Sequence, residues 1–425
     1  MPVDRRLCCI RGPKFVNKSL SMLAARKPCS GSRCSSRPKY LSQMIGCGFR
    51  AAGYRRHKIR ENTHKKWGSC LAVFGVLVAF VIAQSGTVPH RPRAASAAEY
   101  RSNNSRTTST AGIGGGAEKD FTIVVLPDTQ HYTEYYPATF DAQTRWIVDH
   151  KTKLNIRFVM HTGDIVEKTH SELEWARASK SMGYLDGVIP YGIAPGNHDL
   201  DDGLQSGASG SGTIFRRHFP VSRFNQQPGW GAYYDENNLN RNSSYRTFAV
   251  GSLGFIVIFL EWEAPDDVLD WAAGVMRAHP NHRAIIATHF YLAPTSPPRR
   301  NTSWPWPRTK ANHGEDMWRK FVRLQSNIFM VHSGHLFGEA LLASPNDAKK
   351  SVYQIVTDFN QRPNGGDGWL RYYTFKPSLN QIRAFTYSAT LKKFETDANS
   401  QFILPYDMGI RRLQRELLDS HRGIK

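Results

Sequence analysis

The chain has no cysteine after residue 70. All six cysteines lie at positions 8, 9, 29, 34, 47 and 70. The longer, remaining part therefore contains no disulfide and no thiolate metal ligand. Its sequence has no internal repeat. It also has no glycine-rich phosphate loop, because glycines 114–116 precede the first expected strand instead of following one.

Acidic residues are scarce near the N-terminus. Residues 1–98 carry 19 lysines and arginines and 2 acidic residues, a net charge of +17. The rest carries 37 of the 56 basic and 33 of the 35 acidic residues, so only +4 of the total +21 belongs to it. No pattern of basic and aromatic side chains accompanies this small excess. We therefore expect no nucleic-acid partner for the folded part.

Long apolar runs are missing, apart from one short run at residues 70–83. As a helix it would span about 21 Å, less than the roughly 30 Å of a bilayer core. Seven basic residues precede it at 50–66, and the small residues 94–98 follow it. This arrangement favours a secretory signal peptide and export to the periplasm or the extracellular space. The alternative is an uncleaved membrane anchor with the folded domain outside, and in either case only this N-terminal segment would contact a membrane.

Composition divides the chain into five parts. Residues 1–66 are read as a basic disordered leader or as a start codon placed too early. Residues 67–98 are the signal peptide or anchor, and the polar residues 99–120 are a linker. Residues 121–390 form the folded domain, and 391–425 are a tail packed on it or trailing from it.

Apolar periodicity from residue 121 onward predicts alternating strands and helices. We expect strands at 121–126, 155–161, 189–194, 246–250, 254–260, 282–288 and 328–332, and helices at 138–153, 171–185, 266–277 and 315–324. Ser171 and Glu174 predict a capping box at the second helix. Short strands follow at 337–342, 351–357, 369–375 and 382–387. This order predicts an α/β fold in which a mixed sheet packs on a second sheet, with helices outside.

Polar side chains follow five of the expected strands, at the point where each strand ends. They are Asp128, Asp164, Asn197, His289 and His335. Open α/β sheets bind ligands beyond the carboxyl ends of their strands, so we expect one site centred on Asp164. Carboxylate, amide and imidazole groups together bind divalent cations. Each residue also has an ordinary explanation, since aspartates cap helices, asparagines form turns and histidines pack in cores.

The residues around these positions form five motifs. They are Asp128-Thr129-Gln130, Gly163-Asp164-Ile165-Val166-Glu167, Gly196-Asn197-His198-Asp199, Thr288-His289 and Gly334-His335-Leu336-Phe337. This series resembles, in order, the signature of the calcineurin-like metallophosphoesterases. The Asp-Thr-Gln block resembles an exported bacterial subgroup of that family. The resemblance implies a four-layer α/β/β/α sandwich with two mixed sheets, and an enzyme that hydrolyses phosphoesters.

The resemblance also implies a site for two divalent ions (Mn, Fe, Zn, Mg or Ca) about 3.5–4 Å apart. The implied ligands are Asp128 and Gln130 for the first ion, Asn197, His289 and His335 for the second, and Asp164 for both. A metal-activated hydroxide would attack a phosphate mono- or diester. The catalytic residues would be Asp164 and His198, the latter stabilising the transition state or protonating the leaving oxygen. Glu167 and Asp199 would orient the ligands through hydrogen bonds.

Two positions depart from the family pattern. Gln130 and Phe337 stand where the family has histidines, and both histidines are ligands of the first ion. Gln130 still offers a carbonyl oxygen, whereas Phe337 offers no donor. We therefore expect a weak first site, or one that takes a harder cation such as Mg²⁺, Mn²⁺ or Ca²⁺. His131 or His332 are alternative donors, and the position of His332 within a strand favours a structural role.

Several loops are candidates for a substrate rim. The glycine-rich residues 361–371 carry Arg362 and Arg371, either of which would bind a phosphate if it faces the site. An ordinary turn is the alternative. The polar insert at 200–246 is long enough to form a rim or a lid. Two functions stay open: an exported metal-dependent phosphohydrolase, or a surface or binding protein that kept the fold and lost turnover.

Overall fold

The structure is a computed structural model that describes residues 119–201, 211–239, 241–303 and 311–409. The predicted leader, the signal peptide or anchor and nearly all of the linker lie outside these ranges, as does the chain from residue 410 onward. Within the described ranges, no helix is long and apolar enough to cross a membrane.

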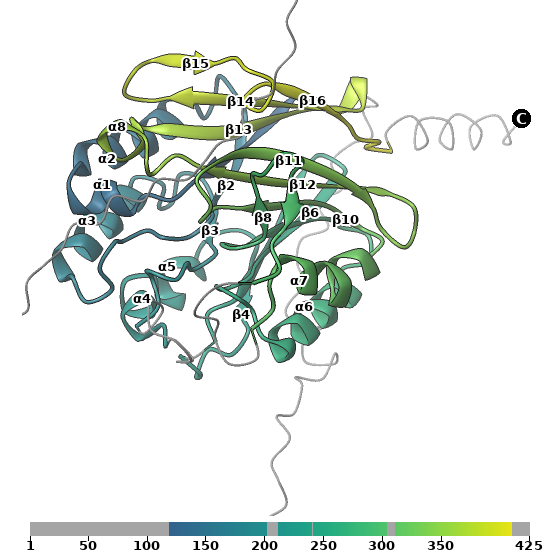
Figure 1. Cartoon of the computed structure of the whole chain (residues 1–425), viewed down its shortest axis with the longest axis horizontal. Helices are drawn as coiled ribbons and strands as arrows, with labels where there is room; N and C mark the ends of the chain where they lie inside the picture. The colour runs from purple at the N-terminus through teal and green to yellow at the C-terminus, as the bar shows by residue number, and fades with distance from the viewer. Residues whose placement is uncertain (1–118, 202–210, 240, 304–310, 410–425) are drawn as a thin grey trace, which may run out of the picture. The chain divides into compact units, whose positions relative to one another are not determined.

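Two seven-stranded sheets form the centre of the domain (Figure 1). Sheet A contains β1 (Phe121–Leu126), β2 (Ile156–His161), β3 (Tyr191–Ile193), β13 (Trp369–Lys376), β14 (Gln381–Ser388), β15 (Lys393–Glu395) and β16 (Phe402–Pro405). Its strand order is β15-β14-β13-β1-β2-β3, and β16 pairs with β14. The strands β1, β2 and β3 are parallel, whereas β13 runs antiparallel to β1.

Sheet B has the same mixed character. It contains β4 (Trp230–Tyr233), β5 (Ser244–Val250), β6 (Leu253–Phe259), β7 (Arg283–Ala287), β10 (Ile328–Ser333), β11 (Gly338–Pro345) and β12 (Ser351–Asp358). Its order is β11-β12-β10-β7-β6-β5-β4. The central strands β12, β10, β7 and β6 are parallel, so their carboxyl ends lie at one edge of the sheet.

Helices cover the outer face of each sheet. The helices in the described residues are α1 (Gln130–Glu134), α2 (Pro137–His150), α3 (Glu172–Gly183), α4 (Thr213–His218), α5 (Val221–Phe224), α6 (Asp266–Ala278), α7 (Gly314–Lys320) and the short α8 (Pro363–Gly366). Figure 1 shows α1, α2 and α3 together on one side of the domain, with α6 and α7 on another.

The alternation of side chains along β1 explains this layering. Ile123 and Val125 enter the core between the two sheets, while Val124 and Leu126 enter a second core with α2 and α3. A third core joins sheet B to α6 and α7. Successive residues of a strand point to opposite faces, so a strand that is apolar throughout is buried on both sides. The result is an α/β/β/α sandwich, as predicted.

Some elements differ from the expectation. The insert at 200–246 forms α4, α5 and β4 in its described part, so much of it is regular structure packed on the domain. Sheet A continues beyond residue 390 with β15 and β16, because both strands pair with β14. The described part of the predicted tail thus packs on the domain as two strands of sheet A. The helix α1 was not expected, since five residues are too few to show periodicity.

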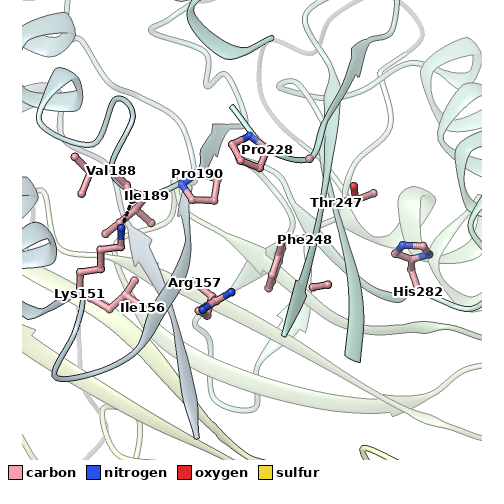
Figure 2. A pocket seen from close by; sticks show the side chains of 12 residues that line it. Lys151, Ile156, Arg157, Val188, Ile189, Pro190, Pro228, Thr247, Phe248 and His282 are labelled. Carbon is pink, nitrogen blue, oxygen red and sulfur yellow. Dashed lines mark hydrogen bonds between the residues drawn. The ribbon is translucent and has the colours of Figure 1, made fainter. Parts of the chain in front are cut away.

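A cavity of about 500 Å³ lies between β2 and β5 (Figure 2). Its lining includes Ile156 at the start of β2, Phe248 and His282 just before β7. These positions mark the amino ends of the parallel strands. The cavity is therefore at the opposite end of the sheets from the five predicted donor residues.

Candidate metal centre

The predicted donor residues meet where the carboxyl ends of the parallel strands converge. Asp164 Oδ2 lies 3.2 Å from His289 Nε2. The same nitrogen is 3.1 Å from Asn197 Oδ1 and 3.2 Å from His335 Nδ1. Asp128 Oδ2 lies 4.0 Å from it and accepts a hydrogen bond from the His335 backbone N–H (3.0 Å). Side chains from both sheets thus surround one point.

The orientation of His289 fits a cation ligand. Its Nδ1 lies 2.8 Å from the Thr162 carbonyl oxygen, which only accepts, so Nδ1 carries the proton. In the neutral ring, Nε2 then points its lone pair at Asp164 Oδ2, Asn197 Oδ1 and His335 Nδ1. Such a group of facing lone pairs suits a divalent cation, and a histidine anchored through its second nitrogen is typical of metal ligands.

Oxygen atoms of the first predicted site are also buried. Gln130 Nε2 donates to Asp164 Oδ2 at 3.3 Å. Asp128 Oδ1 and Gln130 Oε1 are buried and have no hydrogen-bond partner among the described residues. The two ends of an amide are interchangeable by rotation, so Gln130 can turn Oε1 toward a cation that Asp164 shares.

The pKa values of the two aspartates, Asp164 and Asp128, shift in opposite directions. Burial raises the pKa of Asp164, but His289 and His198, when protonated, more than offset this effect and lower the pKa below its usual range. Burial raises the pKa of Asp128 well above its usual value, and the charges of Asp358 and Asp164 raise it further. Asp128 therefore lies in an excess of negative charge, which a bound cation would relieve.

Two of these predicted ligands have unusual backbone conformations. Asp164 has a φ of 50° and His335 a φ of 66°, values that non-glycine residues rarely adopt. Neighbouring glycines leave the space that the carboxylates occupy. A Cβ atom at Gly334 would lie 2.0 Å from Asp128 Oδ1, and one at Gly196 would lie 2.1 Å from Asp164 Oδ1. Strain of this kind gathers at functional sites, where surrounding contacts maintain it.

His198 lies at the edge of this cluster. Its Nδ1 donates to the Glu167 carbonyl oxygen at 2.7 Å, which leaves Nε2 directed to within 4.0 Å of Asp164 Oδ2. Burial lowers the pKa of His198, but the charges of Asp164 and Glu167 and this hydrogen bond outweigh burial and raise it. The Glu167 carboxylate lies 3.6 Å from His198 Nδ1 and 3.8 Å from His131 Nδ1.

Two buried carboxylates hold the loop after β2 in place. Asp199 Oδ1 accepts from the N–H groups of Ile165 (2.8 Å) and Val166 (3.3 Å), and its Oδ2 accepts from Gly196 (2.8 Å). Asp199 thus joins the loop after β2 to the loop after β3, and its orienting role toward a metal ligand stays a prediction. Burial raises the pKa of Asp199 to about 6, with the charge of Asp164 adding to the effect.

Glu174 is the second of these carboxylates, and the sequence indicated a different role for it. Ser171 Oγ accepts from the Glu174 N–H at 3.3 Å, which is one half of the predicted capping box. The Glu174 side chain instead accepts from the N–H groups of Glu167 (2.8 Å) and Lys168 (2.9 Å). It therefore ties α3 to the loop that carries Asp164.

The two arginines predicted for a rim have other contacts. Arg371 is fully buried, and its guanidinium donates to Glu339, to Thr386 Oγ1 (2.9 Å) and to the Asn399 carbonyl oxygen (2.9 Å). This arginine joins sheet B to sheet A and does not reach solvent. Arg362 forms ion pairs with Glu395 and Glu339 (3.4 Å to the latter).

Side chains around the second predicted site were not anticipated. The ring of His335 packs against Trp262 and Phe290, with centroid distances of 4.6 and 4.9 Å. These aromatic groups fix the imidazole orientation.

The Phe337 side chain is 42% exposed, and His332 is buried against Tyr373 with a centroid distance of 5.8 Å. The latter contact places His332 in the core between the sheets.

Two sheets in an α/β/β/α sandwich, with carboxylate, amide and imidazole groups gathered at their carboxyl edge, define the metallophosphoesterase class. The sequence model of the family described as calcineurin-like phosphoesterase matches residues 121–371. The chain belongs to this family. The match confirms the resemblance that the five motifs indicated, and supports phosphoester hydrolysis as the activity of the family.

Known proteins with similar sequences or structures extend this comparison. The uncharacterized protein YvnB of Bacillus subtilis is 31% identical over 305 residues, which are 69% of this chain and 22% of that protein. The chain thus spans less than a quarter of that relative. Among solved structures, purple acid phosphatase PPD1 of yellow lupin aligns with a TM-score of 0.43 and 12% identity, over 69% of this chain and 55% of that one. A Streptococcus pneumoniae protein described as a predicted phosphoesterase aligns with a TM-score of 0.28 and 9% identity, over 68% and 99% of the two chains.

Proposed function

We propose that this protein is an exported, metal-dependent phosphohydrolase that cleaves a phosphate mono- or diester. The observation that supports it most is the group formed by Asp164 Oδ2, His289 Nε2, Asn197 Oδ1 and His335 Nδ1, in which His289 Nε2 lies within 3.2 Å of each of the other three atoms. Export is proposed from the basic flank and short apolar run before residue 98. Fractionation of the native host, with N-terminal sequencing of the protein found outside the cytoplasm, separates cleavage from anchoring.

Each residue has a defined task in this proposal. Asn197, His289 and His335 would hold one ion and Asp128 and Gln130 the other, with Asp164 shared. When bound, the ions would acidify a water molecule and neutralise charge on the phosphoryl oxygens. His198 presents Nε2 toward the cluster while Nδ1 stays bonded to the Glu167 carbonyl. It would give its Nε2 proton to the leaving oxygen, because Nδ1 is already bonded to the Glu167 carbonyl oxygen.

The test is hydrolysis of an aryl phosphate monoester and an aryl phosphate diester by the full chain, with and without added Mn²⁺. We expect metal-dependent turnover that falls by about 10²–10⁴-fold in His198→Ala, the usual contribution of a positioned acid. His170→Ala is the matched control, since His170 is exposed and lies three residues beyond the loop residue Glu167.

A second function has one observation in its favour. Phe337 replaces a family histidine and its exposed side chain offers no donor, which fits a surface or binding protein that lost turnover. Inactivity of the wild type with every metal, unchanged by Asp164→Ala, would favour this alternative and contradict the proposed hydrolase.

A further inference from the structure

Three buried oxygen atoms have no hydrogen-bond partner in the described part of the chain, although each belongs to a polar side chain near the carboxyl ends of the strands. Asp128 Oδ1, Gln130 Oε1 and Asp358 Oδ2 are all buried, and none has a hydrogen-bond partner among the described residues. They come from two segments: the turn from β1 into α1, which carries Asp128 and Gln130, and the end of β12, where Asp358 is the last residue. A buried carboxylate oxygen without a donor costs several kcal/mol unless a cation pairs with it.

Sheet B explains how Asp358 reaches this place. β12 runs parallel to β10, with Ser333 paired to Val356, so Asp358 at the end of β12 lies at about the level of His335, two residues beyond the end of β10. The His335 backbone N–H donates to Asp128 Oδ2, which draws Asp128 to this edge.

The Asp358 carboxylate is oriented so that one oxygen remains available. Its Oδ1 accepts from the Asn360 backbone N–H at 2.9 Å, and this bond fixes the side chain. Oδ2 then faces the buried interior. In the described part of the chain, no lysine or arginine forms an ion pair with Asp128, Asp164 or Asp358. The groups whose positive charge would act on Asp164 are the histidines 289, 198 and 335.

We propose that Asp358 is a ligand of the first cation site, with Asp128, Gln130 and Asp164 as its other protein ligands. This inference rests on the proposed function, because it assumes the two-ion site. Asp358 then takes the place of an imidazole that the family pattern has and this chain lacks. The first site has oxygen ligands only, which favours Mn²⁺, Mg²⁺ or Ca²⁺ over Zn²⁺, whereas the second keeps two imidazoles.

This assignment is tested by measuring Mn²⁺ binding to the full chain with calorimetry and with equilibrium dialysis. For the wild type we expect two Mn²⁺ ions. In Asp358→Asn the affinity for one Mn²⁺ ion should fall by at least about tenfold, a loss typical of substitutions around bound metals. The affinity for the other Mn²⁺ ion should be unchanged. The control is Asp347→Asn, which removes the same charge from an exposed residue in the turn between β11 and β12.

Thermal unfolding measurements distinguish a metal-ligand role of Asp358 from a purely structural role. Asp358→Asn removes repulsion from a metal-free cluster, so without metal its Tm should equal or exceed that of the wild type, while the rise of Tm on adding Mn²⁺ becomes smaller. A lower Tm without metal, together with an unchanged Mn²⁺-induced rise, would mean that Asp358 only supports the fold.

A measurement on the wild type avoids variants altogether. Pulsed electron paramagnetic resonance of bound Mn²⁺ detects directly bonded imidazole nitrogen, and we expect one bound population with this coupling and one without it. Coupling in both populations, or two Mn²⁺ ions of unaltered affinity in Asp358→Asn, would overturn the role of Asp358 and leave the hydrolase proposal standing. A wild type that binds no divalent ion would overturn both.

Discussion

Gly196→Ala tests whether the position of Asp164 controls the centre. The new Cβ atom would lie 2.1 Å from Asp164 Oδ1 and 2.5 Å from the Asp164 backbone nitrogen. Favourable contacts between non-bonded carbon atoms are about 3.5–4.0 Å, so the two loops must separate by roughly 1 Å. The carboxylate oxygen can rotate away, but the backbone nitrogen cannot, and the φ of 50° at Asp164 leaves little freedom for adjustment.

The expected losses follow from this displacement. Overpacking of a close contact costs about 1–3 kcal/mol of folding free energy. A misplacement of about 1 Å among reacting groups costs about 10²-fold in rate. Asp164 Oδ1 also accepts the His198 N–H at 3.0 Å, so the same displacement moves the proposed acid. We expect Gly196→Ala to fold, to lose affinity for Mn²⁺ and to lose about 10²-fold in kcat/KM.

The assay compares Mn²⁺ affinity, kcat/KM for an aryl phosphate and urea unfolding. The matched control is Gly274→Ala in α6, where the nearest atom to the new Cβ is Arg277 Nη2 at an ordinary 3.5 Å. This control should gain about 0.5–1 kcal/mol of stability, as alanine does over glycine in a helix, and keep its metal affinity. Wild-type metal affinity and activity in Gly196→Ala would refute the link between loop spacing and the centre.

Three further predictions concern buried charged side chains and the effect of bound cations. Glu174→Gln weakens the acceptor for two loop N–H groups, so the free energy of unfolding should fall by about 1.5–3 kcal/mol and the affinity for Mn²⁺ should also fall. Unchanged unfolding in urea would contradict this prediction. Arg371→Met leaves the buried Glu339 without its main partner and should cost about 3–5 kcal/mol, and the double variant Arg371→Met/Glu339→Gln should recover part of that loss in a double-mutant cycle. Removing divalent ions with a chelator should lower the Tm of the full chain, and added Mn²⁺ should restore it; an unchanged Tm would show that the buried carboxylates need no cation.

Local patterns carried much of the information about this protein. The strands β1, β2, β7 and β10 and the helices α2, α3 and α6 lie within a few residues of their predicted positions, because apolar periodicity is a property of each segment by itself. The family was also readable, since its motifs place particular residue types directly after strands. The short elements α1, α8 and β15 were missed, because segments of three to five residues show no period.

The tertiary structure decided the role of residues whose partners are distant in the chain. Arg371 looked like a substrate contact in its glycine-rich loop, yet it is buried against Glu339 of the other sheet. Glu174 fits a helix cap by its spacing, yet its carboxylate holds the loop after β2. Asp358 belongs to none of the five motifs, and only the pairing of β12 with β10 brings it beside the donor residues.

The physical reason is the range of each interaction. Periodicity, strand ends and glycine-dependent turns depend on neighbours a few residues away, so the sequence alone determined them. Whether a charged side chain meets solvent, a cation or an opposite charge depends on which strands pack together, and this only the folded chain decided.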